Sequence, residues 1–102
     1  MEIKPGSRWK SAVCGAEMVV VRPPNEAGEL QCGGVAVVSL SSSELAPGDI
    51  HPDHANGVLI GKRYIDVASG LEVLGAKAGK GSLAFDGRPL TLKEAKPLPA
   101  SD

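Results

Sequence analysis

The sequence predicts an all-β protein, a single small antiparallel sandwich or open barrel of about seven short strands. Three observations lead to this fold class. Valine-rich runs recur along the chain, and β-branched side chains fit the pleated surface of a sheet. Thirteen glycines and eight prolines in 102 residues place frequent turns between these runs. No helical pattern longer than about two turns is present, so strand–helix–strand units are not expected.

Four strands are expected in the first half of the chain. Residues 8–14 are expected to be extended, with the lone tryptophan as their anchor. EMVVVR at 17–22 has the strongest strand pattern, because its three consecutive valines are stiff at χ1. PPNEAG at 23–28 predicts a turn, since two prolines remove backbone donors, and ELQC at 29–32 predicts a strand returning to pair with 17–22 as a hairpin. VAVVSL at 35–40 predicts a further strand.

The middle of the chain contains a long loop and a second hairpin. Residues 41–57 are rich in serine, proline and glycine and predict an irregular surface loop with room for one helical turn. VLIGKRYIDV at 58–67 predicts a strand, and LEVLGA at 71–76 predicts its partner after a tight turn. These two strands form the second expected hairpin.

A third hairpin is expected near the C-terminus. SLAF at 82–85 and RPLTL at 88–92 flank Asp86-Gly87, and Asp-Gly between apolar runs is a strong signal for a type I′ turn. Residues 93–102 are proline-rich and are expected to form an extended tail. Residues 1–102 therefore predict one β domain.

The charge pattern limits the class of partner and the compartment. The formal net charge is −1, with 11 basic and 12 acidic residues and no block of like charges. Nucleic-acid binding is not expected, because it depends on clustered lysine and arginine. No apolar run is long enough to span a membrane, and the start MEIKPGSRWK lacks the apolar region of a secretory signal. We expect a cytoplasmic protein.

Two cysteines stand before glycine turns, in AVCGA and LQCGG. Cys14 and Cys32 are candidate metal ligands, and His51 and His54 in HPDH supply the two imidazoles that a tetrahedral zinc site would need. The same thiolates from a second chain are another source of ligands. Two buried, free thiols and a disulfide between the cysteines are also compatible with the pattern.

A ribbon-type knuckle places glycine directly after a metal-binding cysteine, usually in paired Cys-x-x-Cys motifs. Residues 8–38 resemble a zinc-ribbon or rubredoxin-like module that has lost half its ligands, since Ser11 stands where a partner of Cys14 is needed. This resemblance implies zinc or iron as the metal. The chain is also similar to small uncharacterised bacterial proteins with the pattern RW-SAVC, QCGG and GKRY, which implies no particular activity.

GAKAGKGS at 75–82 is a basic, glycine-rich connection. It is not a nucleotide-binding P-loop, because its glycine spacing is one residue short and a strand follows it where a helix is required. Its free amides can still hold a small anion. The candidate anion-binding residues are Lys62, Arg63, Lys77 and Lys80.

No arrangement of catalytic residues is recognisable, so an enzyme is not expected. We expect a non-catalytic cytoplasmic accessory or binding module that acts through protein–protein contacts, with a protein partner or a second copy of itself as a homodimer. An exposed strand edge is one means of such contact. The alternatives are a small metal-binding protein, with zinc or iron at Cys14 and Cys32, and an anion-binding module at the 75–82 loop.

Overall fold

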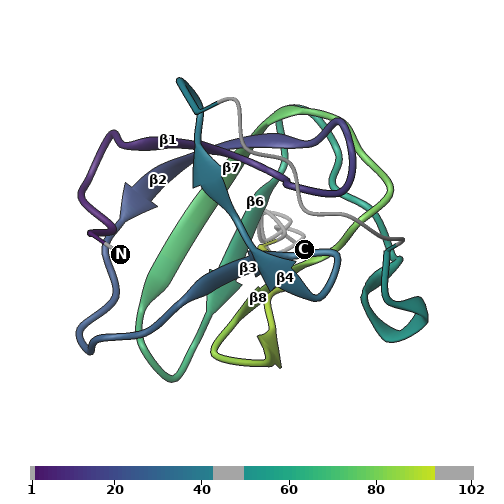
Figure 1. Cartoon of the computed structure of the whole chain (residues 1–102). Coiled ribbons are helices and arrows are strands. Elements are labelled where there is room, and N and C mark those ends of the chain that lie inside the picture. Colours follow the sequence, from purple (N-terminus) through teal and green to yellow (C-terminus); the bar gives the residue numbers. More distant parts are fainter. Residues whose placement is uncertain (1, 43–49, 94–102) are drawn as a thin grey trace, which may run out of the picture.

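The computed structural model describes residues 2–42 and 50–93, which form two antiparallel sheets (Figure 1). The six-stranded sheet has the order β10 (Thr91–Lys93), β6 (Arg63–Asp66), β7 (Leu71–Lys77), β2 (Glu17–Arg22), β1 (Arg8–Lys10), β5 (Val38–Ser39). The four-stranded sheet has the order β4 (Val35–Ala36), β3 (Leu30–Cys32), β8 (Leu83–Phe85), β9 (Arg88–Pro89). The predicted all-β antiparallel class is confirmed.

Helical structure in the described ranges is confined to one 3-10 turn, η1 (Pro52–His54). It lies in the loop expected at 41–57, where room for one helical turn was predicted. Residues 43–49 of that loop, and the expected tail from residue 94 onward, lie outside the described residues. None of the helical structure in the described ranges has the length and apolar character needed to span a bilayer.

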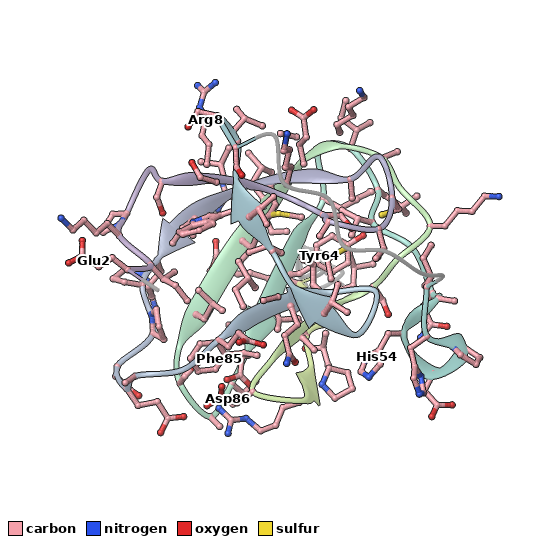
Figure 2. The ribbon with its side chains drawn as sticks, in the orientation of Figure 1. Glu2, Arg8, His54, Tyr64, Phe85 and Asp86 are labelled. Atoms are coloured by element: carbon pink, nitrogen blue, oxygen red, sulfur yellow. The ribbon has the colours of Figure 1, made fainter. Side chains whose placement is uncertain are left out.

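One hydrophobic core lies between the two sheets. On β2, Met18 and Val20 are buried while Glu17, Val19 and Val21 beside them are more exposed, as the alternation of side chains along a strand requires. Across the core, Leu30 of β3 and Phe85 of β8 are direct register partners, and both are fully buried. Figure 2 shows Phe85 pointing inward between the ribbons.

The hairpin expected between 17–22 and 29–32 is wrong, although both segments are strands. β2 pairs with β1 and β7, whereas β3 pairs with β4 and β8 in the other sheet. The connection between them crosses from one sheet to the other, and on the way the backbone N–H of Asn25 donates to the carbonyl of Ser69 at 2.7 Å. Because both edges of each strand are taken by other strands, the two cannot pair with each other.

Two expected strands are each divided, which raises the number of strands above the seven or so predicted. The segment 35–40 changes sheet at Val37, whose N–H donates to Leu30, and the segment 88–92 changes sheet at Leu90, whose N–H donates to Leu83. Both corner residues are buried. The chain therefore turns at each corner from the edge of the smaller sheet to an edge of the larger one.

The other two hairpins are confirmed, with one difference. β6 pairs with β7, and β8 pairs with β9 through Asp86 and Gly87, both at positive φ (50° and 80°). However, β6 begins at Arg63 and not at residue 58. Residues 59–62 form a turn, and Gly61 at φ 78° has the left-handed conformation that interrupts the strand. Similarly, the first strand ends at Lys10, where the 11–16 loop begins.

Two buried carboxylates tie the larger sheet to neighbouring segments. Asp66 accepts from both Arg88 (2.9 Å) and Ser69 (2.6 Å), and Glu72 accepts from Lys93 (2.9 Å) and from Arg63 (3.3 Å). The hydrogen bond from Arg88 lowers the pKa of Asp66, and the bond from Lys93 lowers the pKa of Glu72, more than burial raises them. Arg88 also pairs with Glu26 at 2.8 Å.

Acid should therefore destabilise the fold through these two carboxylates. Because their folded-state pKa values are lowered, the unfolded chain binds more protons as the pH falls below about 4, and stability is lost through that window. We expect the melting temperature to fall on acidification, and the Asp66→Asn, Glu72→Gln double variant to be less stable at neutral pH with a shallower pH dependence. Thermal melts at several pH values measure both. An equally steep dependence in the double variant would contradict this assignment.

Candidate functional site

Three loops from different parts of the chain meet at one end of β7. They are the 11–16 loop between β1 and β2, the Gly33-Gly34 turn between β3 and β4, and the 78–82 loop between β7 and β8. The first is closed by the N–H of Ser11 donating to Ala16 (2.9 Å), and the other two are joined by the N–H of Gly33 donating to Ser82 (3.0 Å). The Cys-Gly turns and the glycine-rich basic loop are thus parts of one site.

Glycine is required at this meeting point because the backbones are in contact. A Cβ on Gly79 would lie 2.5 Å from the backbone nitrogen of Ala16, and a Cβ on Gly81 would lie 2.9 Å from the Cα of Gly33. Cβ atoms essentially never approach other atoms so closely. The added methyl on Gly81 would also lie 3.2 Å from the sulfur of Cys32.

Cys14 is partly exposed and is surrounded by hydrogen-bond donors. Burial raises the pKa of the Cys14 thiol, but four donors acting together lower it below its ordinary value: the Ser11 hydroxyl, the backbone N–H groups of Ala16 and Gly81, and the Cys32 thiol. Donors aimed at a sulfur stabilise the thiolate over the thiol. Cys14 therefore has the environment of a reactive thiolate.

Cys32 has the opposite environment. Its side chain is fully buried in the core between the sheets. Burial, together with the negative charge of the neighbouring Cys14, raises the pKa of Cys32 to about 12. Each thiol contributes to the pKa shift of the other, so the structure pairs one thiol that favours ionisation with one that retains its proton.

Ser11 is the side chain that organises this pair. It is buried, and its oxygen accepts from the backbone N–H groups of Val13 and Cys14, both at 3.1 Å. With those lone pairs occupied, its hydroxyl hydrogen is free to point at sulfur, and it lies within reach of both thiols. The ribbon resemblance implies a missing cysteine at this position, whereas the structure places a hydroxyl donor here.

The two candidate histidine ligands lie near the thiols without joining them. His51 donates its backbone N–H to Gly33 (3.0 Å), and its Nδ1 accepts from Asp53 at 3.1 Å. The Nδ1 of His54 is buried and has no hydrogen-bond partner among the described residues. The two rings are 5.6 Å apart. Within residues 2–42 and 50–93, no group of three or more histidine, cysteine or acidic side chains is arranged to hold a metal ion.

Two of the four candidate anion-binding residues are paired with carboxylates. Arg63 pairs with Glu72 at 3.3 Å, and Lys77 pairs with Glu17 at 3.8 Å. Lys62 and Lys80 are exposed and make no ion pair within the described part of the chain. Lys80 directly precedes Gly81 beside the thiols, and the carbonyl of Lys62 accepts from the N–H of Gly75 at 2.9 Å, which joins Lys62 to the same glycine-rich segment.

A pocket of about 300 Å³ opens beside β6 and the edge strand β10. Its apolar lining comes from Leu59, Tyr64, Leu83, Pro89, Leu90 and Leu92. The backbone N–H of Leu59 donates to the buried Tyr64 hydroxyl at 2.9 Å, which holds the 59–62 turn over the pocket. Leu59 and its neighbour Ile60 are 56% and 67% exposed. The sequence does not predict this pocket, because 58–67 has the pattern of one continuous strand; Gly61, next to two apolar residues, was the available signal.

No protein-family model, curated protein or solved structure matches this chain. The resemblances of its cysteine motifs remain predictions, and function has to be inferred from the geometry of the molecule.

The loop contact at Gly79 can be tested with one methyl group. Gly79→Ala should destabilise the protein by at least about 2 kcal/mol, because the methyl overlaps the backbone of Ala16. Gly15→Ala is the matched control on the same interface: its Cβ would meet only the carbonyl of Ala78 at an ordinary 3.7 Å. Denaturant unfolding measures both variants, and equal stabilities would contradict this packing of the loops.

Proposed function

We propose that the protein is a non-catalytic cytoplasmic binding module that acts through protein–protein contacts, with its binding site at β10 and the adjoining apolar pocket. The observation that carries this proposal is the clustering of exposed apolar side chains there. Five large apolar side chains are exposed in the described ranges, and three of them, Leu59, Ile60 and Leu92, line the pocket or adjoin it. Such clusters are typical of interaction sites.

β10 provides the second element of the proposed site. It is an edge strand of the larger sheet, its only strand partner among the described residues is β6, and all three of its residues are exposed. An edge strand offers unpaired backbone groups to an incoming strand. A partner segment in extended conformation can therefore add to this edge by β-augmentation.

The two faces of β10 differ in chemistry. Leu92 is the register partner of Tyr64, and both line the pocket. Lys93 is the register partner of Arg63 on the opposite face, where both pair with Glu72. Arg22 also contributes to the lowered pKa of Glu72. Three cations thus surround one carboxylate, which leaves this face with a positive charge.

Because a strand is pleated, the difference between these two faces favours a particular pattern of side chains in the ligand. Alternate side chains of an incoming strand point to opposite faces of the sheet. One set would enter the apolar pocket, and the other would meet the positive face. We therefore assign as ligand an extended segment of a partner protein in which apolar and acidic residues alternate. Lys62, exposed beside Arg63, adds to the preference for acidic residues.

A metal-binding role and an anion-binding role have less support in the geometry. A zinc or iron protein needs ligands beyond the Cys14 and Cys32 thiols, and a second chain is the remaining source of thiolates. An anion-binding module at 75–82 would depend chiefly on Lys62 and Lys80, since Lys77 pairs with Glu17 and Arg63 pairs with Glu72. A homodimer through β10 would replace the partner segment by a second copy of this chain.

Binding of a synthetic peptide tests the proposed site. The alternating peptide Glu-Val-Glu-Leu-Glu-Val, carrying a fluorophore, should raise its anisotropy when mixed with the protein. Ile60→Asp should weaken binding by roughly tenfold or more, because a carboxylate beside the pocket repels the acidic peptide and removes apolar contact. Val67→Asp is the matched control, since Val67 is 80% exposed and lies outside the pocket lining.

A block peptide of the same composition, Glu-Glu-Glu-Val-Leu-Val, should bind less tightly, because alternation is what matches the two faces. Equal binding of both peptides, or equal losses in Ile60→Asp and Val67→Asp, would overturn the proposal. A dimer on a sizing column that Ile60→Asp alone dissociates would identify a second copy as the occupant.

A further inference from the structure

We infer that Cys14 and Cys32 form a redox-active thiol pair that exchanges with small disulfides, with Cys14 as the attacking sulfur and Cys32 as the resolving sulfur. This role is independent of the binding role proposed above, because it concerns the two thiols and uses neither the apolar pocket nor β10, although both sites adjoin the 78–82 loop. It rests on a cluster built from three loops, not on either cysteine alone.

The two thiols are brought close together by the packing of the residues beside them. Cys14 lies in the 11–16 loop and Cys32 ends β3, eighteen positions later. A Cβ on Gly33 would lie 2.7 Å from the side chain of Val13, so the residues next to the two cysteines are packed against each other. Gly81 packs against the same turn, where a Cβ would lie 3.2 Å from the sulfur of Cys32. Disulfide formation requires two cysteines whose side chains already point at each other, since a larger separation would demand backbone movement. The packing of Val13 against Gly33 places Cys14 and Cys32 as neighbours, as this requirement demands.

The two sulfurs are suited to different roles. Cys14 is partly exposed and is surrounded by the hydroxyl of Ser11 and the amides of Ala16 and Gly81, so an external disulfide can meet a stabilised thiolate. Cys32 has no exposed surface and can react only with the sulfur of Cys14 beside it. The geometry therefore sets the order of the two steps.

The chemistry balances without any further oxidant. In the first step the Cys14 thiolate attacks a disulfide RSSR, the bond Cys14–S–SR forms, and RS⁻ leaves. In the second, the proton of Cys32 passes to the released RS⁻, the Cys32 sulfur attacks the Cys14 sulfur, and a second RS⁻ leaves. The two protein sulfurs lose two electrons together, and RSSR is reduced to RSH and RS⁻. An external dithiol reverses both steps.

Charge favours this sequence of events. In the reduced state the negative charge of Cys14 helps to keep Cys32 protonated. Once Cys14 is bonded to RS it carries no charge, so this obstacle to the ionisation of Cys32 is removed. The second step is thereby facilitated only after the first has occurred.

The test uses the reduced full-length protein and glutathione disulfide. We expect the wild-type chain to lose both titratable thiols and the mass of two hydrogen atoms, and to recover them with dithiothreitol. Cys32→Ala, which keeps a small apolar side chain in the core, should stop at one glutathione adduct on Cys14. Cys14→Ser should gain neither an adduct nor a disulfide while folded.

The role of Ser11 is tested by the rate of the first step. Ser11→Ala removes a donor to the Cys14 sulfur and should slow adduct formation at neutral pH by roughly threefold to tenfold, because less thiolate is present. Ser69→Ala is the matched control: Ser69 is an equally buried turn serine whose hydroxyl serves Asp66 at the opposite end of the fold. Its rate of adduct formation should equal that of the wild type.

Several results would overturn the inference. These are two unreacted thiols in the wild type, a stable adduct on the wild type as on Cys32→Ala, or modification of folded Cys14→Ser. Zinc or iron purified with the protein, at one per chain or one per two chains and released by Cys14→Ser, would assign the thiols to a metal instead. If Cys32→Ala does not fold, a wild-type disulfide mapped to Cys14–Cys32 by peptide mass still decides the pairing.

Discussion

The close packing of three loop backbones at one end of the fold is the constraint on which the rest of the structure depends. The 11–16 loop of the larger sheet lies directly against the 78–82 loop, which in turn lies against the Gly33-Gly34 turn of the smaller sheet. Only glycine permits this approach, because any Cβ at Gly79 or Gly81 would overlap a neighbouring backbone. The contact closes one end of the core and brings the two thiols together there.

The opposite end of β7 is closed by a different interaction. There Arg88 of the smaller sheet reaches Asp66 of the larger one, and its guanidinium also lies over the ring of Phe85 at 5.6 Å. Figure 2 shows Phe85 and Asp86 together at this end. Removing the partner of a buried carboxylate strongly lowers the stability of a fold. This end is therefore stabilised by an ion pair, whereas the other end is stabilised by close backbone packing.

The two proposed sites share one loop. Gly81 donates its amide to Cys14, while its neighbour Ser82 borders the apolar pocket. The carbonyl of Ser82 also accepts from the N–H of Gly33, and the N–H of Ser82 donates to the carbonyl of His54. The thiol pair and the pocket are therefore built on the same connection between β7 and β8, although one site presents sulfur and the other presents apolar side chains.

Local sequence determined the elements whose formation needs only neighbouring residues. The valine run of β2, the hairpin of β6 and β7, and the Asp86-Gly87 turn follow from χ1 stiffness, alternation and positive φ, which act over a few residues. The tertiary structure alone decided which strands share a sheet, why 35–40 and 88–92 bend at Val37 and Leu90, and that Cys14 meets Cys32 through the glycine-rich loop. Those outcomes depend on competition for strand edges and on backbone fit between distant segments, and a linear pattern does not contain either.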